Sequence, residues 1–165
     1  MATRRILEFL DGSSVRYIRI THSPAFTAQE VAESVHIPGR YMAKTVVVRV
    51  ENGFALAVVP ATKDADLEAL RRQIGASDAK LAEEADFIDR FVGCKLGAAP
   101  PFGNLFGIDT YIDRDLARLD EIAFQAGTHT DVILMNTSDY LRLVRPVPVR
   151  IAVEPIAKHL HVMSL

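Results

Sequence analysis

Apolar residues recur along the chain with two spacings, one typical of amphipathic helices and the other of strands. The first segment, TRRILEFLDG, has the helical spacing and ends at Gly12, so it predicts a short helix. The next segment, VRYIRI, alternates and predicts a strand. Thr27 and Glu30 then have the spacing of a capping box, which predicts a helix over AQEVAESV.

A hairpin and two helices are predicted in the middle of the chain. Two runs rich in β-branched residues, KTVVVRV and GFALAVVP, flank Asn52-Gly53, a pair that favours a tight turn. Farther along, Leu67, Leu70 and Ile74 share one face of a predicted helix that stops at Gly75. The segment EEADFIDRFVG repeats the helical pattern, with two phenylalanines one turn apart.

The second half of the chain predicts further strands, LFGIDTYI, EIAFQAG and DVILMN, then a helix from near Thr137 and a last extended piece, VPVRIAV. Asp113 is expected to cap the turn that follows its strand. No linker or repeat divides the chain, so residues 1–165 are interpreted as one α/β domain. We predict a central mixed β-sheet, open and barrel-like, flanked by short helices. The exposed edge at VPVRIAV could pair with another chain.

Composition narrows the classes of function. The chain has 165 residues, enough to bury a core, and no apolar run approaches the roughly 18 residues of a membrane span. A single cysteine excludes an internal disulfide framework and, with no secretory signal in the sequence, indicates the cytoplasm. The net charge of -2 disfavours a protein that coats DNA or other nucleic acid. It allows a protein that binds one end of an RNA through a local basic patch.

Motifs of several common catalytic and cofactor sites are absent: G-x-S-x-G, Walker A, G-x-G-x-x-G and H-E-x-x-H. We therefore predict no cofactor and no metal. His159 and His161 lie close together in the tail without further ligands, which favours a strand end or a disordered pair over a metal site. Cys94 has no base near it in sequence, which favours a buried, inert thiol over a nucleophile.

Three features remain that can carry chemistry. Lys44 opens a strongly apolar strand, AKTVVV, although an isolated lysine there more often extends to solvent. Residues 92–109, VGCKLGAAPPFGNLFGID, combine glycines with two adjacent prolines and predict a shaped loop, which in most proteins only turns the chain. His129 lies in the tight connection AGTHTDVILM, where a surface histidine is the ordinary alternative. None of the three is specific by itself.

In their order along the chain, these features resemble the YbaK/ProX-like family of aminoacyl-tRNA deacylases, a domain also inserted into or associated with prolyl-tRNA synthetase. The resemblance covers about residues 21–146. It rests on the lysine that opens a strand, on the G-x-x-x-G-A-x-P-P-F-G loop from Gly93 to Gly103, on D-x-x-L after a strand and on the A-G-x-H turn. Residues 147–165 form a C-terminal extension to which the resemblance assigns no role.

The resemblance implies a trans-editing hydrolase that removes a small non-cognate amino acid, chiefly alanine or cysteine, from tRNA for proline. Lys44, Gly97 and His129 would then be catalytic. The implied substrate-binding residues are Thr45, Gly93, Ala98, Pro100, Phe102 and Gly103, with Thr45 at a position where some members carry asparagine. The implied partners are the acceptor end of aminoacyl-tRNA and, in addition, prolyl-tRNA synthetase.

The chemistry of such a site is simple, because an aminoacyl-tRNA ester is already activated. The site must hold the terminal adenosine and the aminoacyl group, polarise the ester carbonyl and admit a water or the neighbouring ribose hydroxyl. Glycine N–H groups can polarise the carbonyl, and a lysine can anchor a phosphate or a developing oxyanion. Two alternatives stay open: a noncatalytic module that binds the tRNA end or a synthetase, and a hydrolase of another small ester.

Overall fold

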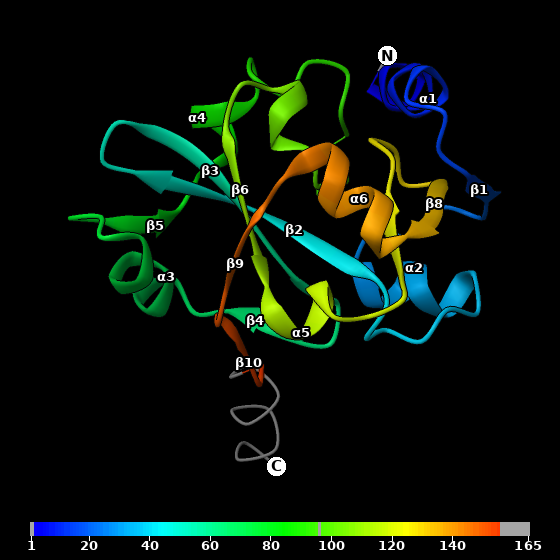
Figure 1. Ribbon diagram of the computed structural model, residues 1–165. Helices are drawn as coiled ribbons and strands as arrows, with labels where there is room; N and C mark the ends of the chain where they lie inside the picture. The colour runs from blue at the N-terminus through cyan, green and yellow to red at the C-terminus, as the bar shows by residue number, and fades with distance from the viewer. Residues whose placement is uncertain (1, 96, 156–165) are drawn as a thin grey trace, which may run out of the picture.

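Two sheets lie side by side in the computed structural model, which describes residues 2–95 and 97–155 (Figure 1). Five strands form a mixed sheet in the order β5-β2-β3-β6-β9, and three form an antiparallel sheet in the order β1-β8-β7. A small third sheet pairs β10 with β4. The strands are β1 (Tyr17–Thr21), β2 (Ala43–Val50), β3 (Gly53–Pro60), β4 (Asp64–Ala65), β5 (Ala79–Leu81), β6 (Asp109–Asp113), β7 (Glu121–Gln125), β8 (Asp131–Asn136), β9 (Val147–Val149) and β10 (Ala152–Val153).

Short helices flank these sheets, so the predicted α/β domain with a mixed central sheet is confirmed. The helices are α1 (Ala2–Gly12), α2 (Ala28–Ser34), α3 (Leu67–Ile74), α4 (Glu84–Phe87), α5 (Arg114–Ala117) and α6 (Thr137–Val144), with a 3-10 turn η1 (Gly103–Leu105). None of the helices that the structure describes has the length and apolar character needed to cross a bilayer.

The ends of α2 and α3 follow the predicted capping signals. The Thr27 hydroxyl accepts a hydrogen bond from the N–H of Glu30, whereas the Glu30 carboxylate contacts the N–H of Phe26 at 3.4 Å. The expected capping box is therefore only half formed, because its return bond reaches one residue too far. At the C-terminal end of α3, Gly75 adopts a left-handed conformation with φ of 71°, which residues with a side chain rarely adopt.

The predicted hairpin is present, with its turn one residue earlier than expected. Strands β2 and β3 pair antiparallel along their whole length, and Val50 lies opposite Gly53. The loop is therefore Glu51-Asn52, and Gly53 is the first residue of β3. Its φ of 157° is one that residues with a side chain rarely adopt, so glycine suits this position next to the turn.

Two predicted segments are shorter than their sequence pattern suggested. In EEADFIDRFVG, only Glu84–Phe87 is helical, and its capping residue Glu83 makes no side-chain hydrogen bond to the first turn. In LFGIDTYI, the strand begins only at Asp109, because Gly107 at φ of 69° turns the chain just before it. Phe87 and Phe91, the two phenylalanines one turn apart in the predicted helix, form an edge-to-face pair with ring centroids 5.7 Å apart.

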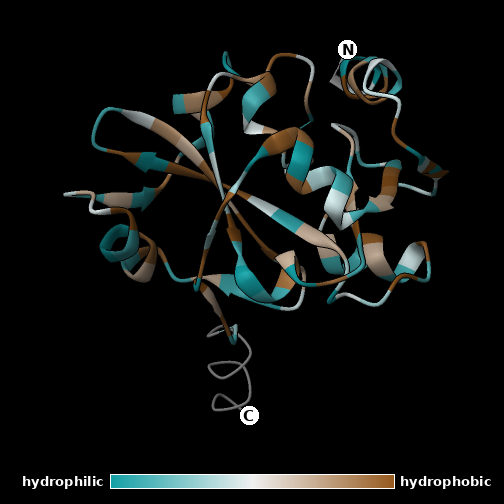
Figure 2. Cartoon of the chain, viewed as in Figure 1, coloured by the Kyte–Doolittle hydropathy of each residue, from teal (hydrophilic) through white to brown (hydrophobic). Residues whose placement is uncertain are grey.

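The main hydrophobic core lies between the two sheets, beneath α1 and α6. Phe102, Phe124 and Tyr140 form an aromatic group at its centre, with ring centroids 5.1 to 6.4 Å apart. Figure 2 shows brown, hydrophobic residues along the strands that cross the centre of the molecule and teal residues over much of peripheral α3. A bridge between Met42 and Ala123 joins the start of β2 to β7 and so holds the two sheets together at one corner.

The side chains of β2 divide between two hydrophobic clusters. Val46 and Val48 pack in the cluster that contains Leu70 of α3, and Val47 packs in the cluster that contains Leu56 and Phe91. Successive side chains of a strand point to opposite faces of its sheet. Lys44 is therefore on the α3 face, and Thr45 is on the face that carries Phe91.

The part of the predicted C-terminal extension that the structure describes, residues 147–155, carries two strands that belong to the fold. β9 pairs parallel with β6 at the edge of the five-stranded sheet, and β10 pairs with β4. Asp113, which is 3% exposed, caps α5 as expected and accepts hydrogen bonds from the N–H groups of Ile151 and Ala152 at 2.9 Å each. One buried carboxylate thus fixes both the β6–α5 turn and the C-terminal strands.

We predict that Asp113→Ala lowers the free energy of unfolding by roughly 2–4 kcal/mol, because the main-chain N–H groups of three residues, Asp115, Ile151 and Ala152, lose their acceptor. Urea unfolding followed by circular dichroism measures the change. Asp115→Ala, at an exposed position in the same turn, is the control and should change stability by at most about 0.5 kcal/mol. Equal losses in the two variants would contradict the anchoring role of Asp113.

Candidate functional site

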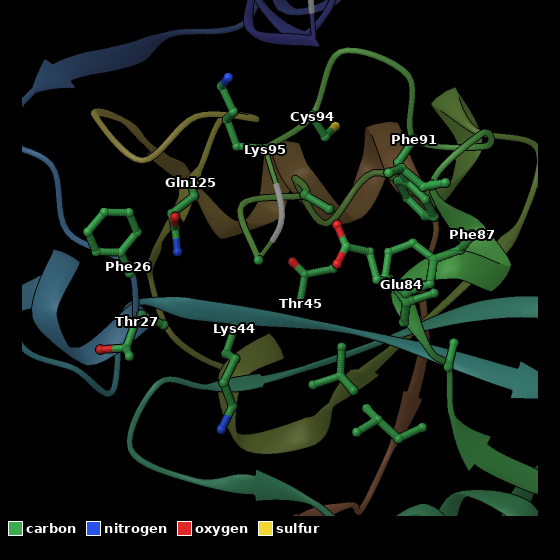
Figure 3. A pocket seen from close by; sticks show the side chains of 18 of the residues that line it. Phe26, Thr27, Lys44, Thr45, Glu84, Phe87, Phe91, Cys94, Lys95 and Gln125 are labelled. Carbon is green, nitrogen blue, oxygen red and sulfur yellow. The ribbon is translucent and has the colours of Figure 1, made fainter.

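A cavity of about 440 Å³ lies against the N-terminal half of β2 (Figure 3). Its volume is within the roughly 300–1,000 Å³ of sites that bind small molecules. The start of α2, strand β2, helix α4, the glycine loop (Gly93–Gly103) and the end of β7 all contribute to its wall. Polar or charged side chains in the lining are Thr27, Lys44, Thr45, Glu84, Cys94, Lys95 and Gln125.

The cavity lies where β2 has an open edge. β5 pairs only with Val48–Val50, and one further bond joins the N–H of Ala82 to the carbonyl of Val47. Main-chain groups of alternate residues point to the same side of a strand. The N–H and C=O of Thr45 therefore point to the same side as the Val47 carbonyl, beyond the end of β5. The cavity thus contains a main-chain donor and acceptor as well as side chains.

Lys44 lines the cavity, but its ammonium group turns away from Thr45 (Figure 3). Lys44 Nζ donates to Asp64 Oδ1 at 2.9 Å, and the two side chains are 29% and 48% exposed. The cause is the alternation along β2, which directs the lysine toward β4 on the α3 face. An ion pair this exposed contributes only about 0–1 kcal/mol, so another anion can replace the Asp64 carboxylate at little cost.

The glycine loop owes its shape to two reciprocal main-chain bonds with the turn that follows β7. Lys95 donates its N–H to the Gly127 carbonyl at 2.8 Å, and Gly127 donates its N–H to the Ala98 carbonyl at 2.8 Å. Gly97 lies in between with φ of 78°, a left-handed conformation that favours glycine. A Cβ at Gly97 would meet its nearest neighbours only at 4.0 Å, so the constraint there is conformational rather than steric.

The proline part of the loop is tied to the core. The buried Tyr140 hydroxyl donates to the Pro101 carbonyl at 2.6 Å, and burial raises the pKa of Tyr140 far above its usual value. Tyr140 thus remains a protonated donor throughout the physiological range. This bond holds the two prolines while the exposed part of the loop faces the cavity.

The turn that carries His129 is held by Asp131. Thr128 Oγ1 donates to Asp131 Oδ2 at 2.7 Å, and Arg19 pairs with Oδ1 at 2.9 Å. Burial by itself would raise the pKa of Asp131, but the hydrogen bonds from Thr128 and Arg19 outweigh it and lower that pKa. The carboxylate is therefore ionised at neutral pH and fixes the turn.

His129 itself stands behind the cavity wall, outside its lining. Its ring packs against Phe26, with centroids 4.9 Å apart, and its Cε1 lies nearest to the position that a Gly97 Cβ would occupy. Its Nδ1 atom is buried without a hydrogen-bond partner in the described structure. This arrangement gives His129 a ring contact with Phe26 of the lining and places it near Gly97, and a catalytic role for it stays a prediction.

The structure separates the nine predicted site residues into two groups. Lys44, Thr45 and Gly97 line the cavity, and His129 supports its wall. The other predicted residues of the glycine loop lie outside the lining: Gly93 is exposed in a turn, and Ala98, Pro100, Phe102 and Gly103 are buried. Phe102 belongs to the aromatic core, and the N–H of Gly103 donates to Thr110 at 3.0 Å. These buried residues pack in the interior of the protein.

The cavity residues that the sequence analysis missed include Phe26, Glu84 and Gln125. Phe26 is 65% exposed, which is unusual for phenylalanine, and the Glu84 carboxylate points toward Thr45 in Figure 3. Only Gln125 had a usable signal in the sequence, because it is a polar residue in the otherwise apolar end of EIAFQAG. Phe26 and Glu84 look like ordinary helix-entry residues until the fold brings them to β2.

Metal ligands do not gather at this cavity or elsewhere in residues 2–95 and 97–155, where no group of three or more histidine, cysteine or acidic side chains could hold a metal ion. His159 and His161, interpreted above as a strand end or a disordered pair, lie outside the described residues.

The chain matches a family described as the aminoacyl-tRNA editing domain over residues 22–143. It therefore belongs to the aminoacyl-tRNA editing family. This membership confirms the resemblance seen in the sequence and the enzyme class, an aminoacyl-tRNA deacylase, that the resemblance implied.

Individual relatives agree with this membership. The multifunctional Ser/Thr-tRNA deacylase ProXp-y of Escherichia coli (strain K12) is 32% identical over 148 residues, covering 87% of this chain and 88% of that protein. The prolyl-tRNA editing protein ProX of Acetoanaerobium sticklandii is 25% identical over 151 residues, with 87% and 91% covered. A crystal structure of a candidate trans-editing enzyme for prolyl-tRNA synthetase matches with a TM-score of 0.78 at 22% identity, over 92% of this chain and 97% of that one, and shares its fold.

Cys94 is predicted to be chemically inert. Burial raises the pKa of its thiol to about 11, so the thiolate is scarce at neutral pH. Alkylation by iodoacetamide at pH 8, followed by mass spectrometry, should be at least about tenfold slower than in a cysteine peptide, whose pKa is about 8.5. Unfolding in urea should restore the peptide rate. Fast alkylation of the folded protein would contradict this assignment.

Proposed function

We propose that this protein is a trans-acting deacylase that hydrolyses the ester of a mischarged tRNA carrying a small amino acid. One observation carries the proposal: in a chain of the editing family, Lys44, Thr45 and Gly97 line a single cavity of small-molecule size. The cavity offers charge, main-chain hydrogen-bonding groups and a glycine turn to one bound group. These are the requirements for polarising an activated ester.

The proposed chemistry uses positioning rather than a covalent nucleophile. The open edge at Thr45 and the turn at Gly97 present main-chain groups to the aminoacyl ester, and glycine allows a close approach. Lys44 would exchange Asp64 for a tRNA phosphate or for the negative charge that develops on the ester oxygen. A water attacks the carbonyl directly, or the neighbouring ribose hydroxyl first takes over the aminoacyl group and a water then attacks the new ester. In either case the ribose oxygen of the broken ester takes up a proton, and the products are the free amino acid and the uncharged tRNA.

The substrate of this reaction is a tRNA whose amino acid is small. The buried Pro100 and Pro101 stiffen the cavity wall from behind. An extra methylene on the amino acid would therefore clash with the wall, whereas a missing methylene would weaken binding only modestly. Alanine or cysteine on tRNA for proline remains a prediction from the family. The names of the relatives add serine and threonine to the candidates. Prolyl-tRNA synthetase as partner and the cytoplasm as location belong to the same proposal.

A panel of mischarged tRNAs tests the proposal. The panel consists of tRNA carrying alanine, cysteine, serine or threonine. We expect hydrolysis of at least one of these four and no efficient hydrolysis of cognate prolyl-tRNA. Binding of the tRNA end without turnover would favour a noncatalytic module instead. Neither binding nor turnover would favour a hydrolase of another small ester. Efficient cleavage of prolyl-tRNA would rule out editing of tRNA for proline.

Lys44→Ala is expected to lower the rate of deacylation by roughly 100-fold or more, on the scale of losing an oxyanion donor. Lys44→Arg should restore little of this loss, because guanidinium keeps the charge but not the compact shape of an ammonium. Single-turnover deacylation of whichever mischarged tRNA the native protein hydrolyses measures both variants, with the melting temperature as control for folding.

Lys63→Ala is the matched control for Lys44. Lys63 pairs with Glu154 and lies outside the cavity lining, although it is only one residue before Asp64. Its removal should leave the rate within about twofold, as is typical of a surface substitution. A near-native rate for Lys44→Ala, or equal losses in the two variants, would remove Lys44 from the mechanism.

A further inference from the structure

Gln125 is a buried polar residue that the proposed chemistry does not use. It is the last residue of β7, is 6% exposed and lines the cavity. Its side-chain oxygen is fully buried and has no hydrogen-bond partner in the described part of the chain. In Figure 3 its amide nitrogen points into the cavity, on the side opposite Thr45. A buried amide without partners is costly, whereas methionine or leucine could fill the position without that cost.

The residues that precede Gln125 along β7, Ala123 and Phe124, are apolar and buried. Along β7, Ala123 on the same face packs in the cluster that contains Val31 and Ala28 of α2. The neighbour on the other face, Phe124, belongs to the main core. The carboxamide is therefore the one polar side chain that this strand directs into the cavity. A ligand in the cavity can accept a hydrogen bond from the amide nitrogen or, after rotation of the amide, donate one to the oxygen.

The amide places a chemical requirement on that ligand. A carboxamide presents N–H donors in one orientation and an oxygen acceptor in the other, and it can rotate between them. A hydroxyl donates and accepts, so it satisfies either orientation. A methyl group satisfies neither, and an ammonium group can only donate. Of the groups that a small amino acid carries, a side-chain hydroxyl fits the amide best.

The position of Gln125 within the cavity suits the side chain of an aminoacyl group. Gln125 is buried, whereas Glu84 and Phe26 are exposed at the rim. The bulky adenosine end of the tRNA must remain at the rim, and the amino acid is the part that enters. The Glu84 carboxylate is available for the α-ammonium group, which leaves Gln125 to contact the side chain.

We propose that Gln125 is the specificity-determining residue of this cavity and selects aminoacyl groups that carry a hydroxyl, namely serine and threonine, over their methyl counterparts. This inference rests on the proposed function, because it assumes that the cavity receives the aminoacyl end of a tRNA. It narrows the substrate class from small amino acids to small hydroxyl-bearing ones.

Two pairs of substrates differ in little more than the hydroxyl: seryl against alanyl, and threonyl against valyl. Each is loaded on the same tRNA, and kcat/KM is measured for the native protein and for Gln125→Met, a substitution of similar volume. We expect the native protein to prefer the hydroxyl-bearing member of each pair by at least about tenfold. In Gln125→Met the preference should fall below about threefold, through loss of the hydroxyl substrates. The melting temperature should not fall.

A matched control is Gln73→Met in α3, which removes hydrogen bonds to Arg150 on a surface outside the cavity lining. It should leave both preferences unchanged. No preference in the native protein, or equal losses on both members of a pair in Gln125→Met, would overturn the assignment of Gln125.

Binding separates this inference from the proposed function. Seryl and alanyl amides of 3′-amino-3′-deoxyadenosine mimic the aminoacyl end of tRNA but cannot be hydrolysed as esters. In calorimetry, the native protein should bind the seryl amide at least about tenfold more tightly than the alanyl amide. The Gln125→Met variant should bind the two amides with equal affinity. If this holds while no ester is cleaved, the inference stands and the deacylase function fails. Equal binding of the two amides, or binding of neither, would overturn the inference.

Discussion

The shortness of β5 is the constraint on which the site depends. Because β5 pairs with only the last three residues of β2, the first half of β2 has main-chain groups directed toward a cavity instead of a neighbouring strand. An open edge ordinarily invites pairing with another chain. Here the glycine loop, α4 and the start of α2 surround the edge, so that it lies in a cavity where a small ligand can reach it.

The cavity wall is held firmly by hydrogen bonds on the side that faces the core, whereas polar groups on the side that faces the cavity have few hydrogen-bond partners. Gly127 clamps the glycine loop through two main-chain bonds, and Tyr140 holds its prolines from beneath. In contrast, Gln125 and His129 carry buried polar atoms that have no partner among the described residues, and Lys44 forms an exposed ion pair with Asp64. Two of the four buried side-chain polar atoms without partners in the described residues thus lie at or beside this cavity, as is expected where ligand binding rather than stability decides the residue.

The sequence was informative about the site wherever the residue had a local reason to be unusual. Lys44 at the head of an apolar strand and glycine at position 97 were both found from the sequence, and both line the cavity. The neighbouring Phe102 and Gly103 were predicted to bind substrate but are buried, because the loop turns inward after its prolines. A glycine-proline motif defines a loop, and it does not determine which residues of the loop face the ligand.

By itself, the sequence determined the types and order of most helices and strands, the mixed sheet and the family, because these follow from periodicity, caps and a motif read along the chain. Only the tertiary structure decided which side chains meet. Phe26, Glu84 and Gln125 come from three separate elements, and nothing local marks them as partners of β2. Likewise, the alternation along β2 fixed Lys44 and Thr45 on opposite faces, but only the placement of β4 gave the lysine its partner Asp64. Contacts between residues distant in sequence depend on how the elements pack, which no local pattern encodes.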